Sequence, residues 1–216
     1  MSKNGKGYMG DQIGKLGPAV GARWKGKMVY RSYQQFVHDP STKRQTLVRA
    51  RFKQLAVMAS AFLNALRIGL AKVAKRYQNT EGNNFMRLNW PAVTATSAEQ
   101  VTVDYASLVI STGHLPQVDF GTPDFDTAGK VTVPIGGVVI EPAKATDKVY
   151  LYVYQPDTGL GLLSEPALRS DSSVSIDVPS VWSGMRVHVY GFAAGAADEY
   201  EGELSPSTYV GTGDLA

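Results

Sequence analysis

The stretch STKRQTLVRARFKQLAVMASAFLNALRIGLAKVAKRYQ, residues 41–78, contains no proline and one glycine, Gly69. Its large apolar residues recur mostly at steps of three and four, which places them on one face of an α-helix. They are Val48, Phe52, Leu55, Ala59, Phe62, Leu66, Val73 and Tyr77. Thr42 followed by Gln45 fits a capping box at the start of a helix. The pattern predicts one long helix, roughly 55 Å at ~1.5 Å per residue, which would bend at Gly69 or within residues 60–64.

The charge of the chain is divided between its two parts. Residues 1–77 contain 16 basic and two acidic side chains, a net charge of +14, whereas residues 78–216 contain six basic and 17 acidic ones, a net charge of −11. Such asymmetry indicates a polyanionic partner for the basic part or head-to-tail contact between copies. A helix with solvated Lys and Arg side chains is the plainer explanation, but solvated helices usually mix both signs. Candidate nucleic-acid-binding residues are Arg23, Lys25, Lys27, Arg31, Lys43, Arg44, Arg49, Arg51 and Lys53.

Before the helix, residues 1–22 are rich in glycine, which costs conformational entropy to order. This composition predicts an arm that stays disordered unless a partner covers it. Its anchors on such a partner would be the large apolar residues of the arm and the tryptophan that follows it. These anchors are Ile13, Leu16, Val20 and Trp24.

Residues 22–36 have a strand signal, with Gly26 marking a hairpin or a bulge. In a single extended strand, Trp24, Met28 and Tyr30 would lie on one face and the basic residues on the other. Basic residues interleaved with aromatic rings are typical of surfaces that bind phosphates and stack on bases. Rings that pack on the long helix explain the same pattern equally well.

After the helix, the polar residues 79–90 predict a turn, and residues 91–98 a linker opened by Pro91. Residues 99–110 predict two short strands. From residue 115 onward, apolar residues alternate in short runs between turn-forming residues. Seven strands are predicted, at 117–120, 130–135, 148–154, 160–164, 173–178, 186–192 and 207–210.

This spacing matches an immunoglobulin- or fibronectin-III-like β-sandwich, which we expect to fold by itself. In the central strand, Val149, Leu151 and Val153 would face the core. The three tyrosines at 150, 152 and 154 would form the opposite face.

We find no pattern of catalytic residues. His38, His114 and His188 lie far apart without metal-ligand spacing, and no G-x-S-x-G turn supports a nucleophile. Asp124 and Asp126 fit a turn, and the acidic cluster at 198–203 fits a solvated loop better than a calcium site. The chain has no cysteine, no apolar run of ~20 residues for a membrane span and no apolar segment for a secretory signal. We therefore expect no enzymatic activity, no cofactor, no metal and no membrane partner.

Several short motifs resemble an uncharacterised protein family common in Bacteroidota. They are GKLGPAVG at 14–21, WKG at 24–26, VYRS at 29–32, VDY at 103–105 and ISTGHL at 110–115. The resemblance covers most of the chain and implies the same order of parts, with a long helix between the N-terminal motifs and the sandwich. It implies no activity, cofactor or catalytic residue.

Together these features predict an α+β fold made of four parts. The parts are a glycine-rich arm (1–22), a basic strand with the long helix and linker (23–98), connecting strands (99–114) and an immunoglobulin- or fibronectin-III-like antiparallel sandwich (115–212). The first functional hypothesis is a structural protein, made in the cytoplasm, that self-assembles or docks with the subunits of a larger particle such as a phage virion. The alternatives are a nonspecific nucleic-acid-binding protein and an adhesive or carbohydrate-binding sandwich that uses its tyrosine-rich face.

Overall fold

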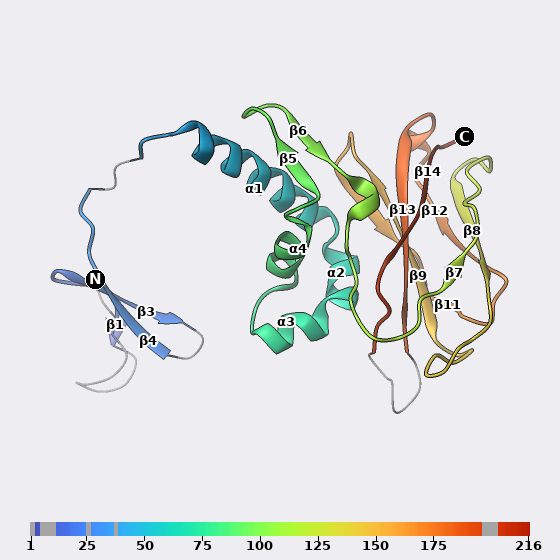
Figure 1. The fold of residues 1–216 in the computed structure, drawn as a ribbon, viewed down its shortest axis with the longest axis horizontal. Coiled ribbons are helices and arrows are strands. Elements are labelled where there is room, and N and C mark those ends of the chain that lie inside the picture. The colour runs from blue at the N-terminus through green and yellow to red at the C-terminus, as the bar shows by residue number, and fades with distance from the viewer. Residues whose placement is uncertain (1–2, 5–11, 25–26, 37–38, 196–202) are drawn as a thin grey trace. The chain divides into compact units, whose positions relative to one another are not determined.

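The structure is a computed structural model that describes residues 3–4, 12–24, 27–36, 39–195 and 203–216 (Figure 1). The chain divides into two compact units, which we call the N-terminal unit (residues 1–42) and the C-terminal unit (residues 43–216). The boundary between them lies directly before the helical stretch. The predicted boundary at 22/23 instead falls inside a β-strand, so it does not separate two elements.

The N-terminal unit contains one antiparallel sheet with the strand order β1-β2-β3-β4. Its strands are β1 (Lys3–Asn4), β2 (Gln12–Leu16), β3 (Ala19–Trp24) and β4 (Lys27–Ser32). The predicted strand at 22–36 is therefore a hairpin of β3 and β4. Residues 12–21, which we expected to be an arm, belong to the same sheet. The reason is that Gly17 forms the turn between β2 and β3 at a φ of 55°, a conformation that glycine adopts without strain.

The long helix of the C-terminal unit is divided into α1 (Lys43–Ala61), α2 (Leu63–Gly69) and α3 (Ala71–Tyr77). It begins directly after Thr42, as the capping pattern predicts. Backbone hydrogen bonds of 2.8–3.0 Å, each reaching back four residues, continue through the two joints at Phe62 and Leu70. A Cβ on Gly69 would lie 2.4 Å from the carbonyl oxygen of Ile110, so only glycine lets the crossing segment approach this turn. The helix bends at both of the predicted places.

The predicted turn at 79–90 is wrong, because residues 81–89 form helix α4 (Glu81–Asn89). The hydroxyl of Thr80 accepts a hydrogen bond from the Asn83 backbone N–H at 3.2 Å and caps the helix start. The Asn89 side chain is buried and bonds to the backbone of Val109 at 2.7 and 2.8 Å. Thr80 therefore caps the helix and Asn89 bridges it to the segment at Val109, whereas the sequence pattern indicated a turn.

The predicted linker at 91–98 contains β5 (Val93–Ala95), which pairs with β6 (Val101–Val103). Of the two strands predicted in 99–110, β6 is present. The second is replaced by a single 3-10 turn at Tyr105–Ser107 and an extended segment. That segment still buries Leu108 and Ile110.

All seven predicted strands of the sandwich are present. One sheet contains β7 (Asp119–Phe120), β8 (Lys130–Gly136) and β12 (Ser173–Asp177), in the order β12-β8-β7. The other contains β9 (Lys148–Gln155), β10 (Leu160–Leu163), β13 (Arg186–Ala194) and β14 (Thr208–Asp214), in the order β10-β9-β13-β14. The two-residue strand β11 (Ala167–Leu168) also pairs with β9, and a 3-10 turn at Ser180–Trp182 precedes β13. This is an immunoglobulin- or fibronectin-III-like antiparallel sandwich within an α+β fold.

The C-terminal unit has two hydrophobic cores that share one sheet. The sandwich core lies between the two sheets and includes Val149, Leu151 and Val153, as predicted. The helix core lies on the other face of β9 and β13, where the helices cover the sheet (Figure 1). The ring of Phe62 lies 4.6 Å from that of Tyr152, measured between centroids. The central strands β9 and β13 are thus buried on both faces.

Two of the three tyrosines predicted to form the outer face of the central strand are buried. Tyr152, Tyr154 and Tyr190 are at most 1% exposed, and the Tyr152 hydroxyl donates to the Ala61 carbonyl at 2.8 Å. Burial raises the pKa of Tyr154 to about 12 and raises the pKa of the other two as well. The helices therefore cover Tyr152 and Tyr154 of the predicted tyrosine face, whereas Tyr150 is only partly buried.

Candidate interaction surfaces

The register of the N-terminal sheet decides which side chains share a face. Cross-strand partners in an antiparallel pair lie on the same face. Val20 is opposite Arg31, Ala22 opposite Val29, and Trp24 opposite Lys27. These three pairs lie on one face, which we call the Trp24 face. The other face contains the pairs of Gly21 with Tyr30 and Arg23 with Met28.

The Trp24 face brings together most of the predicted anchors. Lys15 pairs with Val20 and so lies on this face, and Ile13 has the parity of Lys15. Leu16 pairs with Ala19 on the opposite face, so it does not join the other three anchors. Val29, which sequence reasoning missed, belongs to the Trp24 face. Its place follows from the antiparallel register of β3 and β4, in which Ala22 pairs with Val29.

The same register corrects the predicted separation of rings and charges. Lys27 and Arg31 share the face of Trp24, because β3 and β4 pair antiparallel and cross-strand partners lie on one face. Arg23 lies on the other face, with Met28 and Tyr30. The ammonium group of Lys15 lies 3.9 Å from the centre of the Tyr33 ring. Lys25 lies outside the described residues.

The described part of the N-terminal unit has almost no buried interior. Gly21 is its only buried residue there. Trp24 is 66% exposed, Tyr30 54%, and Ile13 and Val29 46% each. Phe36, after the sheet, is 82% exposed. A small sheet needs a covered apolar face for independent stability, and this one exposes its large apolar side chains on both faces.

The basic residues of α1 do not form one stripe. With about 3.6 residues per turn, Arg51 falls on the side of the buried Leu55 and Met58. Its guanidinium lies 4.2 Å from the centre of the Trp90 ring and donates a hydrogen bond to the Trp90 carbonyl. The other candidates on this helix are exposed, and Arg49 and Lys53 lie one turn apart on its outer side. The exposed ones are Lys43, Arg44, Arg49 and Lys53.

Within the described ranges, no group of three or more His, Asp or Glu side chains is arranged to hold a metal ion. The Asp124 carboxylate accepts from the Asp126 backbone N–H at 2.9 Å, which is the predicted turn. His188 stacks on Tyr105 with ring centroids 4.1 Å apart and shares a 2.9 Å hydrogen bond with the Tyr209 hydroxyl. Burial lowers the pKa of His188. His38 and most of the acidic cluster at 198–203 lie outside the described residues.

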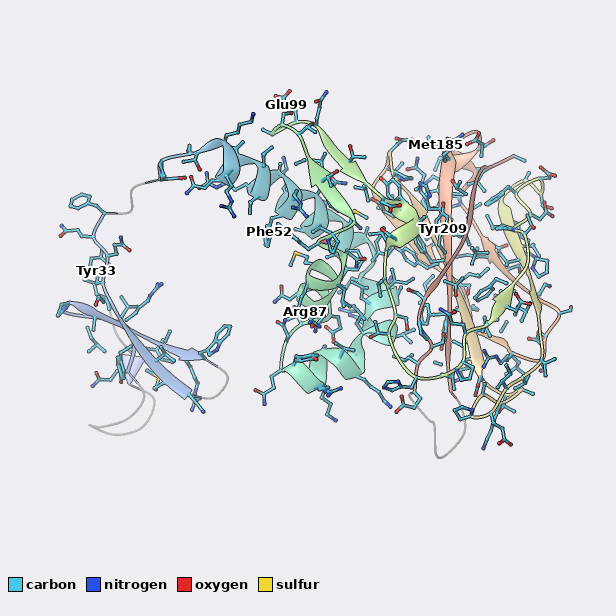
Figure 2. The ribbon with its side chains drawn as sticks, in the orientation of Figure 1. Tyr33, Phe52, Arg87, Glu99, Met185 and Tyr209 are labelled. Carbon is cyan, nitrogen blue, oxygen red and sulfur yellow. The ribbon has the colours of Figure 1, made fainter. Side chains whose placement is uncertain are left out.

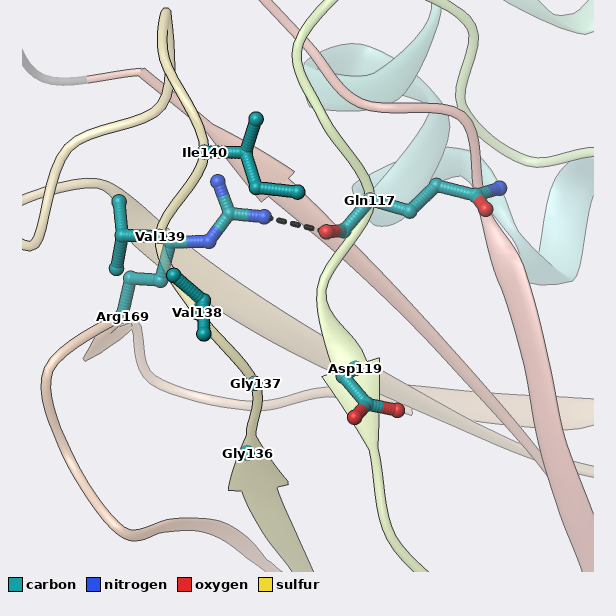
Figure 3. A pocket seen from close by; sticks show the side chains of 8 residues that line it. All are labelled: Gln117, Asp119, Gly136, Gly137, Val138, Val139, Ile140 and Arg169. Atoms are coloured by element: carbon teal, nitrogen blue, oxygen red, sulfur yellow. Dashed lines mark hydrogen bonds between the residues drawn. The ribbon is translucent and has the colours of Figure 1, made fainter.

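One cavity of about 250 Å³ lies at an end of the sandwich, beside the loop that follows β8 (Figure 3). Arg169 forms one wall, and its guanidinium donates to the carbonyls of Pro116 and Gln117, each at 2.6 Å. Burial lowers the pKa of this guanidinium, and Asp147, 3.5 Å away, opposes the shift. The Arg169 side chain thus connects its own segment to that of Pro116 and Gln117.

No helix in the described ranges has the length and apolar character that a bilayer span requires. The fold and these surfaces define an α+β protein with a small exposed sheet and a double-cored sandwich. The chain belongs to a protein family described as "Family of unknown function (DUF6266)", which matches residues 10–211. This agrees with the resemblance to an uncharacterised family that the motifs gave.

A comparison with curated proteins gives no match. Among solved structures, the fn3 domain of the human collagen alpha-1(XX) chain is similar, with 19% sequence identity and a TM-score of 0.34. The similarity covers 49% of this chain and 89% of that domain. The description of the sandwich rests on its strand order and its core, and no function is transferred from this domain.

Proposed function

We propose that this protein is a non-enzymatic structural protein that assembles through the Trp24 face of its N-terminal sheet. The observation that carries the proposal is the missing interior of that sheet, where Ile13, Trp24, Val29 and Tyr30 are each about half exposed or more. Fixing the backbone of each residue costs ~1–2 kcal/mol. A sheet that buries so little of its own surface gains the missing stabilisation from a surface that covers it.

A second copy of the chain is the occupant that the charges favour. Residues 1–42 contain seven basic and two acidic side chains, whereas residues 78–216 contain six basic and 17 acidic ones. Every molecule therefore carries both complementary surfaces. Contact between different surfaces of successive copies is heterologous and generates rings or open filaments. In a larger particle such as a phage virion, the same face would contact a different subunit instead of a second copy of the chain.

The apolar side chains would supply most of the affinity, and the charges would steer the encounter. Exposed ion pairs contribute only ~0–1 kcal/mol each, whereas large buried aromatic side chains dominate interface energetics. Trp24, 66% exposed, is the largest side chain on its face and the principal anchor. On the same face, Lys27 lies opposite Trp24, and Lys15 and Arg31 lie on either side of Val20.

The test is the mass in solution of the full-length protein and of residues 43–216, measured by light scattering at low and high salt. The truncated protein retains both hydrophobic cores, because all their residues lie between 55 and 215. We expect the full-length protein to be oligomeric and the truncated protein monomeric. The double variant Trp24→Ser with Val29→Ser should dissociate the oligomer.

A matched control removes two apolar side chains from the opposite face of the same sheet, as Met28→Ser with Tyr30→Ser on β4. This control should leave the mass unchanged. Equal monomeric masses of full-length and truncated protein at high concentration, with no partner recovered from the native source, would contradict the proposal. Salt-sensitive binding of DNA or RNA by such a monomer would then favour the nucleic-acid hypothesis, which rests on the net +14 of residues 1–77.

A further inference from the structure

A cavity of about 560 Å³ opens between α3, α4 and the segment of residues 112–114. Its lining differs from that of the sandwich cavity, because cationic side chains dominate it. The residues that matter here are Lys72, Arg76, Tyr77, Arg87, His114 and Glu203. All of them belong to the C-terminal unit, so the cavity does not depend on the N-terminal sheet.

Two guanidinium groups lie around one aromatic ring at this cavity. The Arg87 guanidinium, on α4 (Figure 2), lies 4.9 Å from the centre of the Tyr77 ring, and that of Arg76 lies 5.9 Å from it. A ring attracts a guanidinium through its face and leaves the N–H donors available to an anion. Among the described residues, neither guanidinium has a carboxylate within 4.0 Å.

The same cavity already holds one carboxylate. The Lys72 ammonium group lies 2.5 Å from Oε1 of Glu203, and both side chains are partly exposed. The lining thus contains three permanent cations and one carboxylate, a net charge of +2 without His114. Val73 and Leu88 add an apolar part to the wall. The arrangement suits a ligand that combines a carboxylate with an apolar group.

We propose that this cavity binds an acidic peptide segment of a partner protein. Arg76 and Arg87 together hold one carboxylate through charge-assisted hydrogen bonds, which a planar guanidinium donates in pairs. The apolar side chain next to that carboxylate rests against Tyr77 and Leu88. The ion pair of Lys72 with Glu203 interrupts the cationic lining, so the cavity suits a short segment with separate carboxylates better than a continuous line of phosphates.

The test uses the full-length protein and a fluorescein-labelled peptide, Glu-Glu-Tyr-Glu-Glu, with binding followed by fluorescence anisotropy. We expect Arg76→Gln with Arg87→Gln to weaken binding about tenfold or more, because two charge-assisted contacts are lost. The matched control is Arg67→Gln with Lys75→Gln. It removes the same charge from exposed residues on α2 and α3 that do not line the cavity, and should change affinity by less than about threefold, as expected for screened surface charges.

Two further variants separate recognition from folding and from general charge. Glu203→Gln removes the competing carboxylate and should strengthen peptide binding several-fold, a gain that loss of folding does not produce. Arg76→Lys with Arg87→Lys keeps the charge but removes the planar donors, and should retain only part of the affinity. Equal affinities of the cavity and control variants would overturn the proposal. Tighter, Arg76- and Arg87-dependent binding of a single-stranded oligonucleotide would overturn it as well.

Discussion

The N-terminal sheet and the central sheet of the sandwich are both antiparallel, but they differ in how far their two faces are buried. In the central sheet, β9 and β13 are buried on both faces, by the second sheet and by the helices. In the N-terminal sheet, Trp24 on one face and Tyr30 on the other remain 66% and 54% exposed. The comparison indicates that stability and interaction depend on different sheets. The central sheet stabilises the protein and has both of its faces covered, whereas the N-terminal sheet has exposed faces and contributes little to stability.

The largest effect is expected from removing the helices that cover β9 and β13. A protein of residues 115–216 would expose Tyr152, Tyr154, Tyr190 and Phe192 on one sheet face, and such rings bury ~150–250 Å² each. The sequence pattern predicts that the sandwich folds alone. The structure changes this expectation to loss of cooperative unfolding and binding of the dye ANS. Residues 43–216 are the control and should unfold cooperatively. If residues 115–216 also unfold cooperatively and bind no ANS, the sandwich does not need the helix core.

A single substitution in the helix core should have the next largest effect. Phe62 is fully buried against Tyr152, Tyr154 and Phe85, so Phe62→Ala should lower the free energy of unfolding by ~3–5 kcal/mol. Phe52→Ala, ten residues earlier in α1, removes the same ring from a side chain that is 53% exposed and should cost no more than ~0.5 kcal/mol. Urea unfolding of both variants gives the comparison. Similar losses would place Phe52 in a buried contact.

A smaller effect should appear at alkaline pH. Burial raises the pKa of Tyr154 to about 12, above the ~10 of an unfolded tyrosine. Above pH ~10 the unfolded chain therefore loses a proton that the folded chain keeps, so the free energy of unfolding falls as pH rises. Urea midpoints measured from pH 9 to pH 11 should fall, and Tyr154→Phe should reduce the slope. An unchanged slope in that variant would mean that Tyr154 ionises equally in both states.

The smallest effect should come from deleting the N-terminal unit. Because neither core contains a residue from 1–42, residues 43–216 should melt within about 2 °C of the full-length protein when both are monomeric. Differential scanning calorimetry at low concentration measures this. A drop of more than about 5 °C would show that the N-terminal unit stabilises the rest of the chain, and would remove the contrast between the two sheets.

Much of the sandwich was predictable because its signal is local. Alternation along β9 identifies Val149, Leu151 and Val153 as one buried face, and turn residues bound each strand. The burial of Tyr152 was not predictable in the same way. A tyrosine has a polar tip that suits a wet face equally well, and the helix that covers it comes about 90 residues earlier in the chain.

The interaction surfaces were predicted in part, for a related reason. Val20 and Trp24 were predicted as anchors from their size, and the register places them on one face. Leu16 was grouped with these anchors although it lies on the opposite face, and Val29 was not predicted at all. The face of each residue depends on how the three strands pair, which the sequence does not show locally. The cavity at Tyr77 could not be seen from the sequence, since Arg76 and Arg87 belong to two helices whose packing brings them together.

The packing of the helices against β9 and β13 also has a consequence for how the protein is synthesised. Helix α1 ends at Ala61, while β13 ends at Ala194, more than a hundred residues later. At ribosomal rates of ~5–20 residues per second, the helices wait on the order of ten seconds for the strands that cover them. Throughout that interval Phe62 and its apolar neighbours lack the strands that bury them in the finished fold. We therefore expect the helix core to form only after β13 has left the ribosome.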